Sequence, residues 1–411
     1  MGSRGTLVLS LLLILGIALS ATGCGSGSPD PAPDAQGTAA GATGSQAGEP
    51  YKIGALVAIT GGASVLGVPQ RNTLEMLREE VKAAGGIQGP DGLAHPVEIV
   101  IYDTESEETK AVLAAKKLIE EDQVSVILGP STSGESLAVV DTVQKAGVPL
   151  ISMASSKMIV QPVEERKWIF KVGPNDSLTV QGTLAWLKED GHTKLAWLSI
   201  NNAYGDSGKL ELEALAPEYG VEIVASEKMD AGDTDMTAQL TKIRGTDADV
   251  LLIYSILPEV AIAVKNQHDL GMDLSLYAMG GADHAKFIEL ASPEAAEGAR
   301  NLAAKLQYVD QLSDDDPQKP VLVEYNEKYE AAFGSRTDMF GGHAYDAFKI
   351  AVIAMEQVGP DRAPIRDELE SMQFAGCSGV FNWTASDHAG MSPESMVRIE
   401  VVDGAWQMVQ P

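Results

Sequence analysis

The stretch "ILGPSTSGES", residues 127–136, connects a run of strand-forming residues to a run with helical periodicity. It almost matches the phosphate-loop pattern G-x-x-x-x-G-K-[ST], because Gly129, Gly134 and Ser136 occupy the required positions. Glu135, however, stands in the place of the lysine that would neutralise a phosphate. A strand, a tight hydroxyl-rich loop and a helix in succession are typical of an α/β sheet, and the carboxylate argues against a triphosphate ligand.

The same succession repeats on both sides of this stretch. Before it, "YKIGALVAI" (51–59) and "PVEIVIYDT" (96–104) have the apolar character of buried strands, with an amphipathic helix expected between them over 72–86. A second series begins near residue 173 and contains "KLAWLSI" (194–200). Near-continuous apolar strands separated by amphipathic helices indicate parallel sheets covered on both faces. The sequence therefore predicts an α/β fold with two doubly wound parallel-sheet lobes.

The last hundred residues are less regular. Helical periodicity is present over 319–334 and 342–359. Two later segments, "GVFNWT" (379–384) and "MVRIEVVDGAWQMV" (396–409), have the pattern of antiparallel strands, with a turn at Asp403-Gly404.

The first fifty residues carry export signals. A short basic start precedes an apolar run, residues 6–21, that is shorter than the roughly 20 residues a membrane span needs. Small residues before Cys24 resemble the lipobox of bacterial lipoproteins, although Ala21 takes the place of the usual leucine. We therefore predict a lipoprotein signal peptide over 1–23, lipidation of Cys24, and a flexible linker over 24–50 without any aromatic or large aliphatic residue. A cleaved signal peptide with an unmodified cysteine is the alternative.

Composition excludes some classes of protein. The chain has 411 residues, of which 45% are hydrophobic, so it can build more than one core. A formal net charge of −28 argues against nucleic-acid binding, which needs clustered lysine and arginine. Besides Cys24 the chain has only Cys377, so a disulfide framework is excluded and Cys377 is expected to be a packed core residue.

Ligands of open α/β sheets bind beyond the carboxyl ends of the strands, so the loops that follow strands are the candidate site. In the opening stretch, Ser133 is expected to cap the helix by accepting a hydrogen bond from the backbone of Glu135 or Ser136. The free N–H groups of the helix start, with the hydroxyls of Ser131 and Thr132, suit one small carboxylate. The alternative is that these serines only cap a helix.

A second hydroxyl-rich loop favours the ligand hypothesis. The stretch "ISMASSKM", residues 151–158, follows the next strand and presents Ser152, Ser155 and Ser156. Neighbouring strand ends in a parallel sheet can converge on one anion.

Several stretches together resemble a known family. They include "KIGALVAITG", "VILGPSTSGESLAV", "GVPLISMASS", "NNAYGDSG" and "GGHAYDAFKIAV", in this order between Lys52 and Val409. The chain resembles the extracytoplasmic solute-binding proteins of branched-chain amino-acid ABC importers, which have the type I periplasmic binding fold. The resemblance implies a non-enzymatic, exported monomer without a cofactor, anchored by its lipid, that delivers a small solute to an ABC permease and its ATPase subunits.

The resemblance also implies how the lobes are connected. Three hinge crossings are expected near 172–174, 308–313 and 374–379. Lobe 1 would then comprise residues 51–172 plus 310–373. Lobe 2 would comprise residues 173–309 plus 374–411.

The resemblance assigns roles to individual residues of the site. Ser133 matches the serine that holds the ligand carboxylate. Ala154 and Ser156 match a carbonyl and a hydroxyl contributed by the second loop, and Tyr204 matches a tyrosine beside the ligand's amino group. Leu257 lies where amino-acid binders have an aromatic residue before the Pro-Glu pair.

Asp283 is the only acidic residue near the position that holds the ammonium group, and it falls one or two positions late. The solute could therefore be an aromatic or other organic acid without an amino group. His284 could pair with Asp283 or with a polar group of such a ligand, but a surface histidine without a role in the site is the favoured interpretation. A ligand-sensing subunit of a separate receptor is a further alternative.

Enzyme and metal-binding functions have weaker support. "YGDSGK" (204–209) contains the G-D-S-G of a serine-protease loop, but it lies in an α/β pattern and no motif supplies a histidine and an aspartate. The six histidines form no metal-binding pair, and the acidic run "SDDDP" (313–317) lacks the spacing of a calcium loop.

Overall fold

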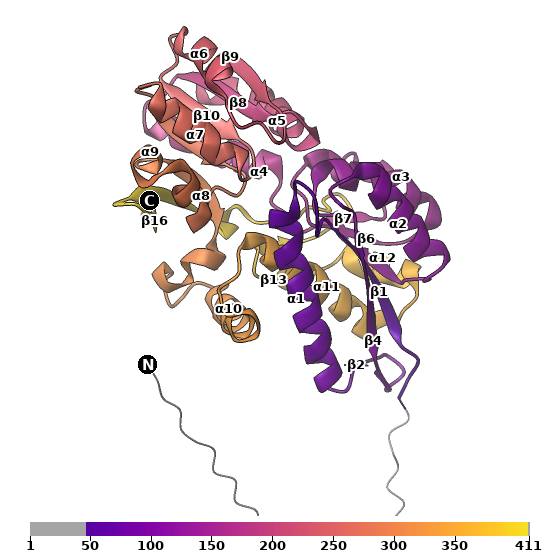
Figure 1. The fold of residues 1–411 in the computed structure, drawn as a ribbon. Helices are drawn as coiled ribbons and strands as arrows, with labels where there is room; N and C mark the ends of the chain where they lie inside the picture. Colours follow the sequence, from indigo (N-terminus) through magenta and orange to yellow (C-terminus); the bar gives the residue numbers. More distant parts are fainter. Residues whose placement is uncertain (1–46, 410–411) are drawn as a thin grey trace, which may run out of the picture. The chain divides into compact units, whose positions relative to one another are not determined.

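The computed structural model describes residues 47–409 (Figure 1). The predicted signal peptide, Cys24 and nearly all of the predicted linker lie outside the described residues, so these remain predictions. No helix within residues 47–409 combines the length and the apolar character that crossing a membrane requires.

The first sheet has five parallel strands in the order β4-β1-β5-β6-β7. They are β1 (Tyr51–Val57), β4 (Val97–Asp103), β5 (Val126–Leu128), β6 (Leu150–Ser152) and β7 (Ile169–Lys171). Ile53 of β1 is in register with Ile99 on one side and Val126 on the other. A short antiparallel pair, β2 (Ile87–Gln88) and β3 (Ala94–His95), precedes β4.

Helices cover both faces of this sheet, as the near-continuous apolar strands predicted. Ile53 and Val57 pack into a core with α1 (Ser64–Ala83) and α11 (Met339–Val358), whereas Leu56 packs into a second core with α2 (Glu108–Glu120) and α3 (Ser133–Ala146). Successive strand residues point to opposite faces, so each face receives its own apolar set. Further elements of this lobe are η1 (Lys157–Ile159), η2 (Val163–Glu165), α10 (Lys319–Phe333) and α12 (Arg362–Leu369).

The second sheet repeats this order. Parallel strands run β9-β8-β10-β11-β12, and β15 and β16 add an antiparallel edge. The strands are β8 (Lys194–Ile200), β9 (Glu222–Met229), β10 (Val250–Tyr254), β11 (Ser275–Met279), β12 (Arg300–Ala304), β15 (Met396–Val402) and β16 (Ala405–Met408). The covering helices are α4 (Asp176–Glu189), α5 (Ala203–Tyr219), α6 (Thr237–Arg244), α7 (Glu259–Asp269), α8 (Ala285–Ala291) and α9 (Pro293–Ala296). Asp403 and Gly404 have φ values of 52° and 73°, which confirms the predicted turn as a tight hairpin.

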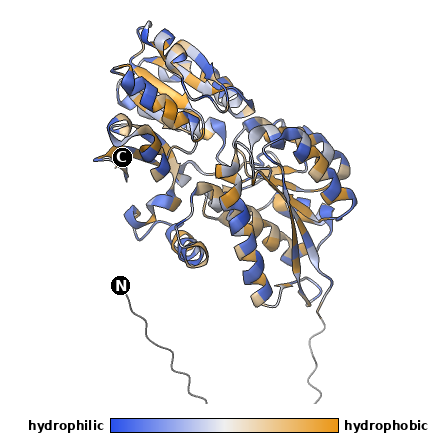
Figure 2. Cartoon of the chain, in the orientation of Figure 1, coloured by the Kyte–Doolittle hydropathy of each residue, from blue (hydrophilic) through white to orange (hydrophobic). Residues whose placement is uncertain are grey.

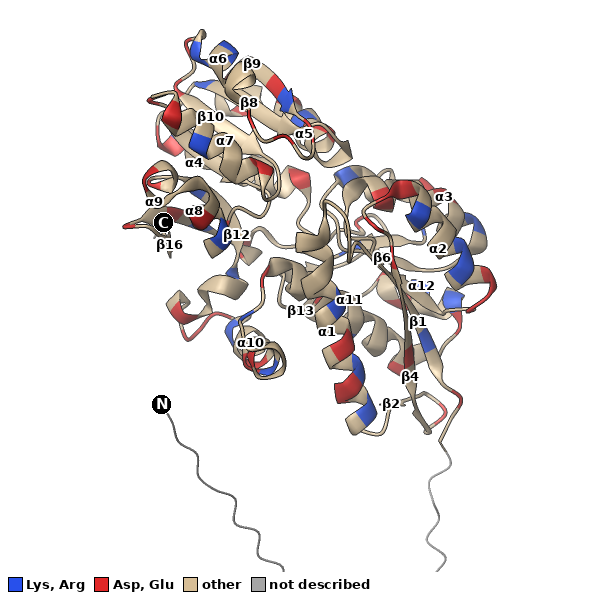
Figure 3. Ribbon diagram, in the orientation of Figure 1, with Lys and Arg blue, Asp and Glu red and all other residues tan. Residues whose placement is uncertain are grey.

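Side-chain character follows these layers. The strands of both sheets are predominantly hydrophobic, and the outer faces of the helices are hydrophilic (Figure 2). Acidic and basic side chains are spread over the helices and loops more than over the strands (Figure 3). A charged exterior therefore surrounds the apolar cores of both lobes.

The chain passes between the two sheets three times, and the third passage corrects a prediction. The first lies between β7 and α4, and the second runs through η3 (Lys305–Gln311). The third was expected near 374–379, but β13 (Gln373–Ala375) and β14 (Val380–Asn382) pair with each other, and Phe381 and Trp383 are buried in the core of the first sheet. The passage therefore follows Trp383, whose ring lies 5.1 Å from that of Phe170, and includes η4 (Pro393–Ser395).

The correction changes the boundary of lobe 1 and one strand pairing. Residues 374–383 belong with the first sheet, not with lobe 2 as predicted. The segment "GVFNWT" pairs with β13 and not with the C-terminal hairpin. Two large aromatic side chains bury more apolar surface in the first core than an edge position on the second sheet would allow. Cys377 is fully buried in the same core, as predicted.

Asp346 of α11 anchors this returning segment and gives a stability prediction. Its carboxylate accepts hydrogen bonds from the backbone N–H of Cys377 (2.6 Å) and of Ser378 (2.7 Å). Asp346→Ala would leave both buried N–H groups without a partner, which should lower the free energy of unfolding by roughly 2–4 kcal/mol in urea denaturation. Asp367→Ala, at an exposed position on α12, is the control and should change it by less than about 0.5 kcal/mol. Equal losses in the two variants would contradict this role.

Candidate functional site

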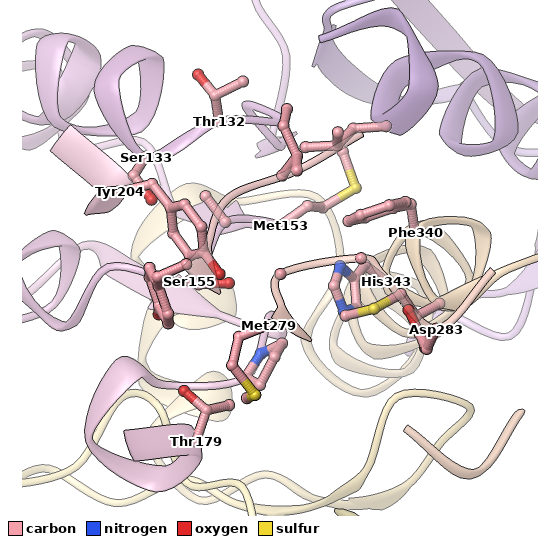
Figure 4. Close-up of a pocket in the computed structure, with 18 of the residues that line it drawn as sticks. Thr132, Ser133, Met153, Ser155, Thr179, Tyr204, Met279, Asp283, Phe340 and His343 are labelled. Carbon is pink, nitrogen blue, oxygen red and sulfur yellow. The ribbon is translucent and has the colours of Figure 1, made fainter. Parts of the chain in front are cut away.

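One pocket lies where the carboxyl ends of the strands of both sheets meet (Figure 4). In each sheet the strand order reverses beside the first strand, between β1 and β5 and between β8 and β10, and α/β ligands bind at such switch points. The pocket encloses about 800 Å³ free of atoms, part of it open to solvent. Its walls come from both lobes, and include Leu66, Ser131, Thr132, Ser133, Met153, Ala154, Ser155, Thr179, Asn202, Tyr204, Tyr254, Ile256, Met279, Asp283, Asn301, Met339, Phe340, His343 and Met396.

The structure of the loop after β5 explains why Glu135 stands in the position of the phosphate-loop lysine. Thr132, and not Ser133 as predicted, caps α3: its hydroxyl accepts from the N–H of Glu135, and the Glu135 carboxylate accepts from the N–H of Thr132 (3.2 Å) and from its hydroxyl (2.8 Å). This capping box needs an acidic residue three positions after the cap, which Glu135 is for Thr132 and not for Ser133. The glutamate in the lysine position is therefore buried against the cap and does not line the pocket.

Because Thr132 caps α3, the Ser133 side chain does not cap this helix, and it connects the two hydroxyl-rich loops. Its Oγ accepts from the backbone N–H of Ser156 (3.2 Å), and its side chain lines the pocket. This confirms that the two neighbouring strand ends converge. Ser131 also lines the pocket, but its hydroxyl donates to Gln70 (2.5 Å) and accepts from the N–H of Ala58 (3.0 Å), so it is committed to the protein.

The second loop contributes different residues from those predicted. Ala154 lines the pocket, as expected. Ser156 does not, because its hydroxyl turns away to donate to Ser207 of α5 in the other lobe (2.8 Å). Ser155 takes its place in the wall, and its carbonyl accepts a hydrogen bond from the buried Lys171 (2.5 Å). Burial lowers the pKa of Lys171 to about 7, although the charge of Asp176 opposes this.

Tyr204 is held at the pocket wall by its surroundings in the second lobe. Asn202 caps α5 by accepting from the N–H of Tyr204 (3.0 Å) and of Gly205 (3.1 Å). The Tyr204 ring stacks on Tyr254 at 4.4 Å between centroids. A Cβ at Gly280, which has φ +87°, would lie 2.5 Å from the Tyr204 hydroxyl, so a side chain at residue 280 would displace that hydroxyl.

The structure also shows where the predicted site residues Leu257, Asp283 and His284 lie relative to the pocket. Leu257 is buried in the core of the second lobe, and its neighbour Ile256 lines the pocket instead. Asp283 does line the pocket and is only 4% exposed. His284 caps α8 by accepting from the N–H of Lys286 (3.0 Å), so it neither lines the pocket nor pairs with Asp283.

Asp283 has an unusual environment for a carboxylate. Burial raises its pKa to about 7, and the negative charge of Asp338 adds to the shift. Its Oδ2 has no hydrogen-bond partner among the described residues. Asp283 is therefore more easily protonated than an ordinary carboxyl, and its Oδ2 is open to a partner inside the pocket.

Sequence reasoning missed His343. It lies on α11, is 1% exposed, and lines the pocket beside Phe340 and Asp283 (Figure 4). Burial lowers its pKa to about 3, helped by the charge of Lys171. The nearby carbonyl of Met153 acts in the opposite direction, although neither ring nitrogen reaches it with hydrogen-bond geometry. A single histidine in an apolar helix has the pattern of a core residue, and nothing in the sequence shows that this helix begins at the pocket.

An apolar wall was missed as well. Met153, Met279, Met339 and Met396 all line the pocket, although they are up to 243 residues apart in the chain. Methionine is flexible and polarizable, so it adapts to apolar ligands of different shape. The pocket thus combines hydroxyl loops on one side with a deformable apolar surface.

A known protein family matches this chain over most of its length. The model of the family described as "Periplasmic binding protein" matches residues 50–405. The chain belongs to this family. Its type I periplasmic binding fold, with two α/β lobes and a ligand pocket between them, agrees with the prediction from sequence.

Several relatives of this periplasmic binding protein are characterised by name. It is 23% identical over 339 residues to the leucine-, isoleucine-, valine-, threonine- and alanine-binding protein of Pseudomonas aeruginosa. The aligned region covers 82% of this chain and 86% of the Pseudomonas protein. An extracellular ligand-binding receptor from Rhodopseudomonas palustris is 29% identical, with a TM-score of 0.80 over 88% of this chain and 99% of the other. A branched-chain amino acid transporter substrate-binding protein from Streptococcus pneumoniae, solved with isoleucine, is 25% identical, with a TM-score of 0.74 over 88% and 100%.

The structure also locates the protease-like stretch of this periplasmic binding protein. Ser207, the serine of the protease-like stretch, hydrogen bonds to Ser156 and to no histidine among residues 47–409. The same part of the chain has no group of three His, Cys, Asp or Glu side chains that could hold a metal ion.

The buried histidine predicts how stability depends on pH. Because the folded protein keeps His343 neutral down to about pH 3, only the unfolded chain binds a proton as the pH falls below about 6.5. Stability is therefore lost toward low pH, by roughly 2 kcal/mol at pH 5 from this group. The difference in unfolding free energy between the parent protein and His343→Gln should shrink by that amount between pH 7.5 and pH 5. The exposed His268→Gln is the control, and a constant difference for His343→Gln would contradict the prediction.

The hydrogen bond between the hydroxyls of Ser156 and Ser207, which joins the two lobes, gives a further prediction about stability. Ser156 and Ser207 are both buried, and their 2.8 Å hydrogen bond joins the second loop to α5. A double-mutant cycle of Ser156→Ala and Ser207→Ala should give a coupling energy of about 0.5–1.5 kcal/mol in urea denaturation. Ser156→Ala combined with the distant, exposed Ser371→Ala should be additive. Additivity in the first cycle would show that the pair contributes nothing.

Proposed function

We propose that this protein is the extracytoplasmic solute-binding component of an ABC importer, and that it captures a small carboxylate-bearing solute, a branched-chain or related amino acid, by closure of its two lobes. The observation that carries the proposal is the pocket itself. Its lining includes Ser133 and Ala154 of the first lobe and Tyr204 and Asp283 of the second. The named relatives, which include amino-acid-binding proteins, support the same class of solute.

The first lobe supplies groups for a carboxylate. Ser133 accepts from the N–H of Ser156, so its hydroxyl proton is free to donate into the pocket. The helix α3, 14 residues long, begins here and adds the positive end of its dipole. Each hydrogen bond to a charged group in such a site contributes about 1.5–3 kcal/mol.

The second lobe and the apolar wall determine what lies beyond the carboxylate. Asp283, when ionised, can accept from an ammonium group, and Tyr204 also lines the pocket. The raised pKa of Asp283 equally allows a neutral carboxyl, which favours the alternative that the solute is an aromatic or other organic acid without an amino group. The methionine wall accommodates either kind of apolar body.

The sequence of the N-terminal residues supports a proposal about where the protein is located in the cell envelope. We propose a signal peptide over residues 1–23, a lipid on Cys24 and a monomer that delivers its solute to a permease with ATPase subunits. A ligand that binds the closed form better than the open form shifts the population toward the form a permease would recognise.

A thermal-shift screen of the purified protein tests the proposed solute. Leucine, isoleucine and valine are compared with benzoate, phenylacetate and hexanoate, because a ligand at 100 times its Kd adds roughly 2.7 kcal/mol of stability. Stabilisation by the first group supports the hypothesis that the solute is an amino acid. Stabilisation by the second group alone supports an organic acid without an amino group. No shift with any carboxylate would contradict the proposed function.

The carboxylate contact is tested by Ser133→Ala. We expect at least a tenfold higher Kd for the best ligand by calorimetry, because a hydrogen bond to a charged group is lost. Ser136→Ala is the matched control: it lies on the same helix, is buried, bonds to Ser152 (2.9 Å) and does not line the pocket. Its Kd should stay within about twofold of the parent protein. An unchanged Kd for Ser133→Ala would place the carboxylate elsewhere.

A further inference from the structure

Three polar side chains in the pocket wall lack partners. The Oδ2 of Asp283, the Oδ1 of Asn301 and both ring nitrogens of His343 make no hydrogen bond within the described residues. All three residues are more than nine-tenths buried and line the pocket. They come from three separate elements, since Asp283 follows β11, Asn301 lies in β12 and His343 lies in α11.

The opposite side of the pocket differs in this respect. The hydroxyls of Ser131 and Thr132 are hydrogen bonded to Gln70 and Glu135. In Figure 4, Thr132 and Ser133 lie well away from His343 and Asp283. Among the described pocket-lining residues, the buried polar atoms without any hydrogen-bond partner thus belong to Asp283, Asn301 and His343.

Unsatisfied polar atoms in a buried position are costly. Each costs about 1–3 kcal/mol when no partner replaces water, and such groups in a folded protein call for a specific explanation. Here the atoms converge on one cavity from both lobes, so a group of the solute can satisfy them together.

The hydrogen-bonding character of the three side chains restricts that group. The unpartnered oxygen of Asn301 is an acceptor and requires a donor, whereas Asp283, when protonated, is a donor and requires an acceptor. A neutral His343 ring carries one N–H, which also requires an acceptor. An ammonium group offers donors only and would leave the donors of Asp283 and His343 unsatisfied. A hydroxyl has two lone pairs, which can accept from Asp283 and His343, and one proton, which it can donate to Asn301.

We propose that His343, together with Asn301 and Asp283, binds a hydroxyl group of the solute at the end remote from its carboxylate. The inference rests on the proposed carboxylate site and narrows the solute to a hydroxylated carboxylic or amino acid. His343 comes from the first lobe and the other two residues from the second, so this contact also joins the lobes when the solute is bound. Discrimination arises because a solute without the hydroxyl leaves these buried groups unpaired.

Matched pairs of solutes test the proposal. Calorimetric Kd values are measured for tyrosine and phenylalanine, and for 4-hydroxybenzoate and benzoate. We expect the hydroxylated member of at least one pair to bind ten times more tightly or better. Binding of carboxylates without any such preference would overturn this proposal but leave the proposed function intact. Absence of binding by every carboxylate would overturn both.

Variants assign the preference to His343. In His343→Leu the preference should fall below about threefold, whereas the unhydroxylated member should keep its Kd within a factor of about three. His343→Gln, which retains a donor and an acceptor, should restore part of the preference. His268→Leu, at an exposed position on α7 outside the pocket, is the matched control and should keep the full preference. A preference that survives in His343→Leu would exclude this residue.

Asn301→Leu provides an independent arm if His343→Leu does not fold. It removes the unpartnered Oδ1 from β12 while keeping a side chain of similar volume. The hydroxyl preference should again fall, at least threefold. An unchanged preference in Asn301→Leu would overturn the proposal.

Discussion

Parallel strands bring all their carboxyl ends to one edge of a sheet, and this constraint underlies the whole site. In each lobe the strand order reverses beside the first strand, so the loops there diverge and leave a crevice. The crevices of the two lobes share one pocket. The backbone N–H of Ser156 donates to Ser133 because β5 and β6 are neighbours, and Tyr204 is at the wall because α5 starts directly after β8.

The polar groups of the pocket divide into a rigid set and an open set. On the side of the first lobe, the capping box of Thr132 and Glu135 and the bond from Ser131 to Gln70 hold the hydroxyl loops in place. Preorganised groups of this kind lose little freedom when a ligand binds. On the other side, Asp283 and His343 are buried without partners. Desolvation of these groups is a cost that the folded protein carries, and it is relieved only by a solute of complementary chemistry.

The accuracy of the sequence reasoning depended on the distance over which residues interact. Ser133, Ala154, Tyr204 and Asp283 all line the pocket, because each follows a strand whose end could be recognised locally. At Ser156 and Leu257 the neighbouring residue, Ser155 or Ile256, lines the pocket instead. Beyond a strand end the strict alternation of side chains is lost, so the direction of a loop residue depends on its tertiary contacts.

By itself the sequence determined the α/β class, the two series of strands and helices, and the strand ends at which a ligand site had to lie, since these depend on local hydrophobic periodicity. The tertiary structure alone decided that Phe381 and Trp383 join the first core, and that His343 and Asn301 complete the pocket. These residues lie far along the chain from the loops they join, and their positions follow from which apolar surfaces pack together. Packing of that kind leaves no periodic signal in the sequence.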